Sequence, residues 1–252
     1  MRIATWNVNS ARTRAGRMAD FLTRHDIDVC LVQETKSTDA QFPADSFPGY
    51  EIAHFGLNQW NGVAILSKVG LEGVEKQFPG QPGFHKDPAQ PQELEARAIS
   101  AICGGVRVWS VYVPNGRDIA DRHYDYKLRF LYALAKYVEN TTGPLVIGGD
   151  FNVAPRDEHV WSMAAFAGLT HVTEPERQAF DMLVESGLTV ASPFSGYSYW
   201  DYKGARFDRG EGMLIDFQLS RDLKVANTFI DVDERATKGA SDHAPVIVDY
   251  LL

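Results

Sequence analysis

The chain has 252 residues, 44% of them hydrophobic, which suits one domain over residues 1–252 with a sizeable core. Its formal net charge of −8 argues against a polyanionic partner, because phosphate contacts are usually made by clustered lysine and arginine. A divalent cation held by several acids would weaken that objection, since the cation supplies positive charge. No apolar run approaches the roughly 20 residues that span a bilayer. The N-terminus enters a strand-like pattern directly, so we expect a cytoplasmic protein with no membrane partner.

The chain contains two cysteines, Cys30 and Cys103, and each has apolar neighbours. Buried, reduced thiols are typical of a reducing compartment. We therefore expect neither a disulfide nor a zinc site.

Two stretches of the chain show the same order of predicted elements. In the first, a strand over residues 3–6 leads into a polar loop at Asn7, and a helix with apolar residues at helical spacing follows. A buried strand over residues 29–32 then runs to Glu34. The order is therefore strand, asparagine-bearing loop, helix, strand and acid.

The second stretch repeats this order with a strand over residues 106–113, a loop at Asn115, an apolar-faced helix, and a strand over 145–147 that runs to Asp150. Ligand sites in α/β folds lie at the carboxyl ends of strands. We therefore expect internally similar halves that bring Glu34 and Asp150 to one site.

The sequence GGDFN at residues 148–152 directly follows an apolar strand. Side chains two apart on extended backbone point to the same side, so Asp150 and Asn152 are expected to face one site. A carboxylate beside an amide suits a base that deprotonates water, with a neighbour that orients it or binds an oxyanion. The alternative is an Asx turn that caps a following helix.

An acid and a histidine are adjacent at Asp242 and His243, before the last apolar strand. Neighbouring side chains diverge, so the acid could serve a metal and the imidazole a carboxylate or phosphate. Asp216 lies inside an apolar strand, where an unpaired charge is costly. His243 is a candidate partner, because a buried aspartate orients the ring and stabilises imidazolium. A buried ion pair with an arginine is the alternative.

Two further features are less specific. Glu34 could bind a hard cation, since magnesium prefers one or two carboxylates with water and substrate phosphate, or it could be a surface acid. Residues 197–203 are dense in aromatic side chains. These could line a pocket for an unstacked sugar, contact a nucleic-acid groove, or belong to the core.

Ordered blocks of the sequence together resemble exonuclease III and its apurinic/apyrimidinic endonuclease relatives over nearly the full length. In chain order the blocks are WNVNSAR at 6–12, QETK at 33–36, NGVAI at 61–65, VYVPNG at 111–116, GDFN at 149–152, ID at 215–216 and SDHAP at 241–245. Several ordered blocks at comparable spacing are far more specific than any one motif.

The resemblance implies a four-layer α/β/β/α sandwich, with two β-sheets face to face, helices outside, and an active site at one end. It implies a Mg²⁺-dependent DNA phosphodiesterase of base-excision repair, with Mn²⁺ able to substitute. Such an enzyme cuts 5′ to abasic sites, removes nucleotides and blocking groups from DNA 3′ ends, or does both. The expected partner is double-stranded DNA with abasic sites or damaged 3′ ends, and the expected state is a monomer.

The resemblance also implies a role for each matching residue. Those expected at the metal are Glu34, with Asn7 and Asp242 nearby, and Asp150 and Asn152 for a second ion. The expected catalytic set is Asp150 as general base, Asn152 as its orienter, Tyr112 at the phosphate or leaving group, Asn115 at the oxyanion, and Asp216 paired with His243. The expected DNA contacts are Arg117, Tyr199, Trp200, Lys203 and Ile215, with Tyr199 and Ile215 lining the pocket for a flipped-out abasic sugar.

Two features depart from the family pattern. Leu214 stands where the family commonly has arginine, and the segment 187–193 is shorter and lacks the usual aspartate and arginine. These changes predict either lost surface salt bridges or a weakened DNA-facing loop. Neither change involves the catalytic set.

Two other functions share some of these features. One is hydrolysis of phosphoesters in lipids, inositol phosphates or nucleotides by an enzyme of the same fold; the aromatic segment, Arg117 and the block at 111–116 favour DNA instead. The other is non-catalytic nucleic-acid binding, which gives no reason to keep every catalytic position.

Overall fold

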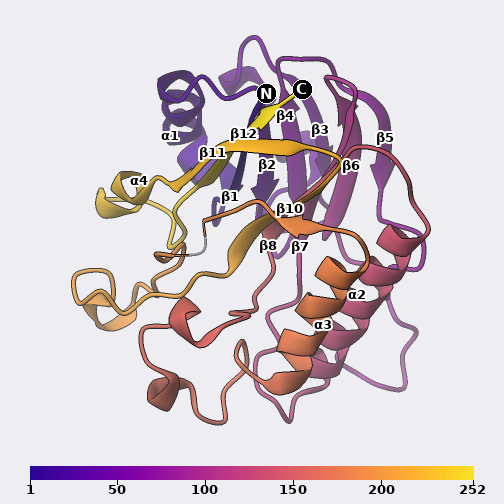
Figure 1. Ribbon diagram of the computed structural model, residues 1–252, viewed down its shortest axis with the longest axis vertical. Coiled ribbons are helices and arrows are strands. Elements are labelled where there is room, and N and C mark those ends of the chain that lie inside the picture. The colour runs from indigo at the N-terminus through magenta and orange to yellow at the C-terminus, as the bar shows by residue number, and fades with distance from the viewer. Residues whose placement is uncertain (194) are drawn as a thin grey trace.

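Two six-stranded β-sheets packed face to face form the centre of the molecule (Figure 1). The computed structural model describes residues 1–193 and 195–252. The first sheet has the strand order β11-β12-β1-β2-β4-β3 and consists of β1 (Arg2–Asn7), β2 (Val29–Gln33), β3 (Glu51–Phe55), β4 (Val63–Ser67), β11 (Lys224–Ile230) and β12 (Val246–Leu251). The second has the order β5-β6-β7-β8-β10-β9 and consists of β5 (Glu72–Lys76), β6 (Ala98–Cys103), β7 (Val106–Tyr112), β8 (Leu145–Asp150), β9 (Thr189–Val190) and β10 (Asp216–Arg221).

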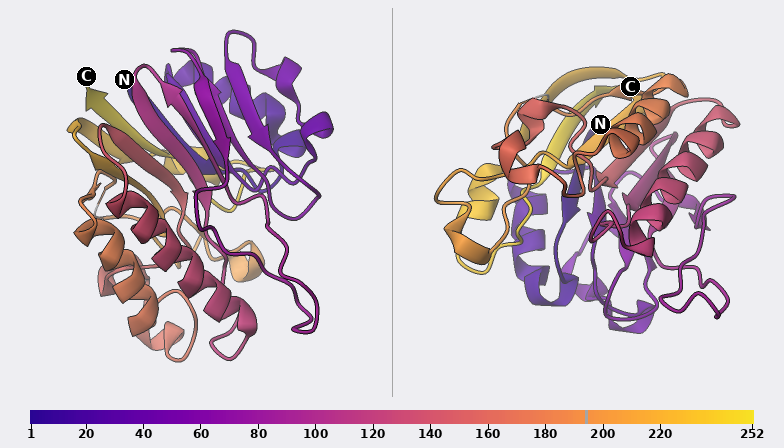
Figure 2. Two further views of the ribbon diagram at one scale, coloured as in Figure 1. Left: turned by 90° about the vertical axis from the view of Figure 1, so that its right-hand side faces the viewer. Right: turned by 90° about the horizontal axis from the view of Figure 1, so that it is seen from below.

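Helices cover the outer faces of both sheets, so the molecule has the four layers implied by the resemblance (Figure 2). Helices α2 and α3 lie side by side on the second sheet, and α1 lies on the first (Figures 1 and 2). The α-helices are α1 (Ala11–Arg24), α2 (Arg122–Glu139), α3 (Glu174–Glu185) and the short α4 (Val232–Ala236). Short 3₁₀ turns are η1 (Asp39–Gln41), η2 (Ala44–Ser46), η3 (Asp157–His159), η4 (Met163–Phe166) and η5 (Lys203–Ala205).

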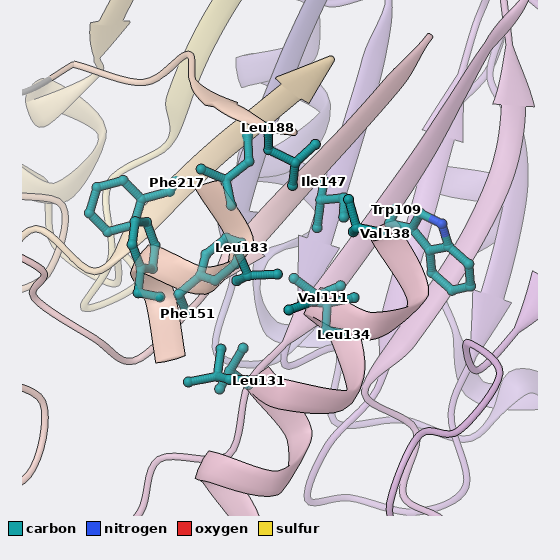
Figure 3. Packing of buried hydrophobic residues seen from close by; sticks show 14 of the residues in the cluster. Trp109, Val111, Leu131, Leu134, Val138, Ile147, Phe151, Leu183, Leu188 and Phe217 are labelled. Atoms are coloured by element: carbon teal, nitrogen blue, oxygen red, sulfur yellow. The ribbon is translucent and has the colours of Figure 1, made fainter. Parts of the chain in front are cut away.

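Three apolar clusters hold the four layers together. One joins α1 to the first sheet through Met18, Phe21 and Leu22, which share one face of the helix at the predicted spacing. A second fills the space between the sheets. The third joins α2 and α3 to the second sheet, where Leu134 and Leu183 meet strand residues such as Ile147 (Figure 3). Burial on both faces explains why the central strands are almost continuously apolar.

Each sheet contains one parallel strand pair that is connected through a helix. In the first sheet β1 runs through α1 into the parallel neighbour β2, and in the second β7 runs through α2 into the parallel neighbour β8. The repeated order seen in the sequence therefore corresponds to two strand–helix–strand units. Both cysteines are buried and free, as expected. Among the described residues, the structure has no helix long and apolar enough to cross a membrane.

Buried polar side chains fix how the two sheets are aligned. The Gln33 amide donates to Ser110 Oγ across the interface at 3.0 Å, and Ser110 Oγ donates to the Val32 carbonyl at 2.9 Å. Gln218 of the second sheet donates to the carbonyls of Ile3 and Val246 in the first, at 2.9 and 3.1 Å. Because buried polar groups must be paired, these bonds favour one alignment over all others. That alignment sets the relative positions of the strand ends.

We predict that Gly149→Ala destabilises the protein while Gly16→Ala stabilises it. A Cβ on Gly149 would lie 1.9 Å from the Val111 carbonyl oxygen of the adjacent strand, so the substitution should cost about 3 kcal/mol or more. Gly16 lies in α1 with nothing within 4 Å of such a Cβ, so alanine there should add about 0.5–1 kcal/mol. Urea unfolding of both variants measures the two shifts. Equal stability of the two variants would contradict the close packing of β7 on β8.

Candidate active site

The candidate acids gather at one end of the sandwich because they lie at neighbouring strand ends. Asn7 ends β1, Glu34 follows β2, and Asp150 ends β8. Asp216 begins β10, which is antiparallel to β8 and pairs Asp216 with Asp150. Like charges directly opposite each other in a sheet are destabilising. This pair therefore needs a cation between the carboxylates.

His243 provides that cation. Its Nδ1 lies 2.8 Å from Asp216 Oδ2, and its Nε2 lies 3.8 Å from Asp150 Oδ2. All three side chains are buried. Ser198 Oγ also donates to Asp216 Oδ2 at 2.6 Å, which fixes the carboxylate. Burial alone would lower the pKa of His243, but Asp216, with help from Asp150 and Asp242, raises it to about 10. The ring is therefore an imidazolium at neutral pH.

Asp150 is a second buried acid that faces His243, on the Nε2 side of the ring. Burial raises the pKa of Asp150 to about 7, although the charge on His243 acts in the opposite direction. Its Oδ2 accepts from the Asn7 amide at 3.0 Å, and its Oδ1 accepts from the backbone N–H of Asn152 at 2.9 Å. A carboxylate whose pKa is near neutrality is suited to proton transfer.

The contact between Asp150 and Asn152 differs from the expected one. The strand ends at Asp150, and Asn152 has a left-handed backbone with φ of 51°. The backbone of Asn152, not its side chain, orients Asp150, in the geometry of an Asx turn. No helix starts within this turn in the described part of the chain, so the alternative role as a helix cap does not apply.

The Asn152 side chain holds Asn115 instead. Asn115 Nδ2 donates to Asn152 Oδ1 at 3.1 Å, while Asn152 Nδ2 donates to the Val113 carbonyl at 3.1 Å. Asn115 itself is exposed, so its amide can reach a bound group.

Tyr112 lies on the adjacent strand β7, where burial and the negative charge of Glu34 raise its pKa well above 10. Its hydroxyl is therefore a proton-bearing donor at neutral pH.

Glu34 is held as a carboxylate by two donors. Asn7 Nδ2 donates to Glu34 Oε1 at 2.9 Å, and Lys36 Nζ lies 2.8 Å from Oε2. Burial alone would raise the pKa of Glu34, but the Lys36 ammonium and the Asn7 amide hold it below its usual value. Glu34 also has a left-handed backbone, with φ of 51°, which is a strain typical of functional positions.

Asn7 occupies a different place from the ligand position expected. Its amide nitrogen donates to both Glu34 and Asp150, and its oxygen accepts from the backbone N–H of Asn9 at 3.0 Å. Asn7 is therefore a bridge between two carboxylates, and its oxygen is already engaged. The amide stabilises this arrangement, because a buried carboxylate needs a hydrogen-bond donor.

Asn9 and Lys36 complete the cluster and were not singled out in the sequence. Asn9 Nδ2 donates to Asp242 Oδ1 at 3.0 Å, and Lys36 Nζ donates to Asn9 Oδ1. Asp242 is thereby connected to Glu34 through two side chains. Their positions could have indicated them, because Asn9 lies two residues after Asn7, and Lys36 two residues after Glu34.

The donor set fits a hard divalent cation. Carboxylate oxygens from Glu34 and Asp150, with Asp242 nearby, are the ligands that magnesium prefers. Asp150, Asp216 and His243 also present three potential ligand atoms within 4.8 Å of one another. An imidazolium has no free lone pair for a metal, however, so the oxygens of Glu34 and Asp150 fit a cation better than His243 does.

A hollow of about 270 Å³ opens beside His243. Tyr199 forms part of its wall, and the Tyr199 ring centroid lies 4.8 Å from that of His243. Its remaining lining is mixed: apolar side chains include Trp161, Phe166, Leu169 and Met213, and polar or charged ones include His171, Asn115, Asp201, Arg206 and Glu211. The lining by His171 and Met213 was not anticipated, because these residues come from irregular segments without a periodic pattern.

Two residues that were expected to line the sugar pocket or contact DNA are buried instead. Ile215 is 2% exposed and packs under the hollow beside Met213, which takes the lining position. Trp200 is 5% exposed and packs edge-on against Tyr197 and Phe207, so it supports the loop and does not present its ring. Residues distant in sequence, such as Val160 and Val172, cover Ile215, whereas Trp200 packs against residues of its own loop. The local sequence pattern indicates neither arrangement.

The expected cationic contacts are exposed. Arg117 lines the hollow, and also lines a second hollow beside Trp60, whose side chain is 69% exposed. Lys203 lies on the surface turn η5. Both residues can therefore reach an anionic ligand.

Leu214 and part of the segment 187–193 belong to the packed fold and not to a surface loop. Leu214 is fully buried in the apolar cluster under α2 and α3, so a lost surface salt bridge does not describe this position. Leu188 is buried in the same cluster, and Thr189–Val190 forms the edge strand β9. This part of the segment closes the second sheet and is not a free loop, while position 194 lies outside the described residues.

Comparison with known proteins places the chain among phosphoester-cleaving enzymes. The model of the Endonuclease/Exonuclease/phosphatase family matches residues 4–243. An exodeoxyribonuclease of Bacillus subtilis is 29% identical over 98% of both chains. A solved Neisseria 3′ phosphatase bound to a product DNA hairpin superposes with a TM-score of 0.90 at 32% identity, and an AP endonuclease from Archaeoglobus fulgidus with 0.90 at 29%, each over 100% of both chains.

The chain belongs to the endonuclease/exonuclease/phosphatase family. Within it, the resemblance to exonuclease III and the AP endonucleases is confirmed, and the chain is a hydrolytic nuclease of that type. The four-layer fold is confirmed by the same structural relatives.

We predict that the stabilisation of His243⁺ by Asp216 depends on pH. Because the pKa of His243 is raised from the ordinary 6.5 to about 10, its contribution is complete below pH 6.5 and is lost as the pH rises through about 10. Asp216→Asn should lower the free energy of unfolding by about 3 kcal/mol near pH 6, and by less near pH 10. Urea unfolding across this range measures the difference. A difference that stays constant or grows with pH would exclude a raised His243 pKa.

Proposed function

We propose that this nuclease is a Mg²⁺-dependent DNA phosphodiesterase of base-excision repair, which cuts 5′ to abasic sites and processes DNA 3′ ends. The observation that carries the proposal is the imidazolium of His243, 2.8 Å from Asp216 and 3.8 Å from Asp150, beside the Glu34 carboxylate. A fixed positive charge, a buried base and a hard-cation site together match what phosphodiester hydrolysis requires.

The cation would be held by Glu34 and Asp150, with Asp242 close by. When bound, Mg²⁺ supplies Lewis-acid stabilisation of the phosphoryl oxygens, and Mn²⁺ offers the same chemistry with similar ligands. The cluster of acids around Asn7 would repel a phosphate on its own. A bound cation would reverse the local charge, which answers the objection raised by the net charge of −8.

The chain's own groups then have distinct roles. Asp150, oriented by the backbone of Asn152, accepts the proton of the attacking water. The Nε2–H of His243 donates a hydrogen bond to the phosphoryl oxygen as negative charge develops, and Asp216, bonded to Nδ1, keeps the ring charged and oriented. The Asn115 amide and the protonated Tyr112 hydroxyl provide further donors to the phosphate or the leaving oxygen.

The hollow beside Tyr199 suits a sugar that has left the base stack. Its apolar wall can pack on the carbon face of a ribose, and Arg117 and Lys203 can meet flanking phosphates. An abasic sugar and a frayed 3′ terminus both meet this description, and relatives are named for activities on each. We further propose that the chain acts as a monomeric single domain on double-stranded DNA in the cytoplasm.

The assay that tests the proposal compares three duplexes with and without magnesium. One carries a single abasic analogue, one a 3′-phosphate, and one is undamaged and blunt. Cutting of the abasic strand, or release of the 3′ group, supports the proposal and gives the balance between the two activities. A protein that binds these duplexes but leaves all three intact would be a binder and not a nuclease for them.

We predict strict dependence on a divalent cation, with Glu34 as a principal ligand. Excess chelator should abolish cutting, and Glu34→Ala should raise the magnesium concentration for half-maximal rate by at least about tenfold. The exposed acid Glu139, at the end of α2, is the matched control, and Glu139→Ala should leave the magnesium requirement unchanged. Full activity in chelator, or equal magnesium curves for the two variants, would overturn the metal assignment.

We predict that removal of the general base or of the charge stabiliser reduces the rate of cutting but not the affinity for DNA. Asp150→Asn should lower single-turnover cutting by about 10²–10⁴-fold, and His243→Asn by about 10²–10³-fold. Fluorescence anisotropy should show both variants binding duplex within a few-fold of the parent. Asp216→Asn should resemble a milder His243→Asn, and the double variant should be much less than multiplicatively impaired because the two residues act as one unit. Parental rates for Asp150→Asn and His243→Asn would refute these roles.

A further inference from the structure

A completely buried ion pair lies beneath the active-site loops. Lys127 of α2 and Glu176 of α3 each have 0% side-chain exposure, and Lys127 Nζ donates to Glu176 Oε1. Burial of two charges costs several kcal/mol per ion, so such a pair is weak grounds for expecting added stability. Apolar residues of similar size could join the two helices. The pair therefore calls for another explanation.

The remaining hydrogen bonds of Lys127 are made to loops that carry site residues. Its ammonium donates to the Asn152 carbonyl at 2.5 Å and to the Asn115 carbonyl at 3.2 Å. It also lies 3.2 Å from Thr170 Oγ1, next to His171 in the wall of the hollow. One cation thus joins three segments that are distant in sequence.

Glu176 ties down the third of these segments. Its Oε1 accepts from Thr170 Oγ1 at 2.5 Å and from the His171 backbone N–H at 2.9 Å. Its Oε2 accepts from the N–H and hydroxyl of Thr173, at 3.0 and 2.7 Å, as part of the capping box of α3. The start of α3 and the wall of the hollow are therefore held by the same carboxylate.

The backbone of these loops needs such support. Asn152, His171 and Arg117 all have positive φ, at 51°, 81° and 59°. A left-handed conformation at a non-glycine residue costs about 1–3 kcal/mol and persists where surrounding contacts enforce it. Gly116 also packs tightly on the pair, since a Cβ there would lie 2.7 Å from Thr170 Oγ1 and 3.2 Å from Lys127 Cδ.

We propose that Lys127 and Glu176 are positioning residues for phosphodiester hydrolysis, which act by fixing the backbone of Asn115, Asn152 and His171. The reasoning follows from what Asn152 does: its N–H orients Asp150, and its side chain holds Asn115. Anchoring the Asn152 carbonyl therefore fixes the base and the amide that meets the phosphate together. This role rests on the proposed function, because it presumes a reaction at Asp150.

The experiment compares Lys127→Met, Glu176→Gln and the double variant with a control substitution on the same helix. Arg129→Met is the matched control, since Arg129 forms an ion pair with Asp125 on the surface of the same helix, 2.8 Å apart, without reaching the loops. Single-turnover rate, KM and thermal unfolding are measured for each on duplex with one abasic analogue. Hydrogen exchange of segments 113–117, 150–154 and 170–173 provides a readout that needs no activity.

We expect Lys127→Met to lower kcat by about 10²-fold, because small displacements of catalytic groups have effects of that size. Its KM should stay within a few-fold, and exchange in the three segments should accelerate. Glu176→Gln keeps every lysine donor and should lower kcat less. The double variant leaves no unpaired buried charge, so it should regain stability over the singles while kcat stays low. Arg129→Met should match the parent in every measurement.

Three results would overturn the proposal. One is a double variant with parental kcat, and another is a rise in KM with unchanged kcat, which would mean a role in DNA binding. The third is unchanged exchange in the three segments for Lys127→Met. A parent that cuts none of the duplexes refutes the proposed function, whereas faster exchange in Lys127→Met would still show that the pair positions these loops.

Discussion

The site depends on one constraint, which is that carboxylates on neighbouring strand ends must share a buried space. Asp150 and Asp216 face each other across β8 and β10, and the His243 imidazolium between them relieves their repulsion. The same need for a donor between acids applies to Glu34 and Asp242. The Asn7 amide lies between Asp150 and Glu34, and a lysine and an asparagine continue the chain of contacts to Asp242.

This chain of alternating acids and donors reconciles an acidic protein with a phosphate substrate. Glu34, Asp150 and Asp216 each have two donors from the protein, which keep the carboxylates ordered. Carboxylates accept more hydrogen bonds than this, so capacity for a cation remains. His243 and Lys36 hold their positive charge within the acid cluster itself. A strongly basic surface is therefore not required at the point of cleavage, although flanking phosphates can still meet Arg117 and Lys203.

The positions of the strand ends could be predicted from the sequence, because they follow from the local pattern of apolar residues. The exposure of individual side chains could not be predicted in this way. Apolar runs indicated where β2 and β8 end, and so predicted that Glu34 and Asp150 lie together, while the place of Asn7 came from the family resemblance. The burial of Ile215 depends on residues far away in sequence, and that of Trp200 on how its own loop folds, and no periodicity indicates either. Asn152 shows a third case: its left-handed backbone turns the N–H, and not the side chain, toward Asp150, and leaves the side chain to hold Asn115.

The division between strand ends and loops also bears on substrate choice. Glu34, Asp150 and Asp216 lie at strand ends whose alignment is fixed by polar bonds between the sheets, so the chemical step rests on paired strands and not on loops. The wall of the hollow comes instead from irregular segments around Leu169 and Tyr199. Loops tolerate substitution better than paired strands. Under the proposed function, changes in that wall alter which sugar or 3′ end is accepted while leaving hydrolysis intact, so one framework can serve several DNA-repair reactions.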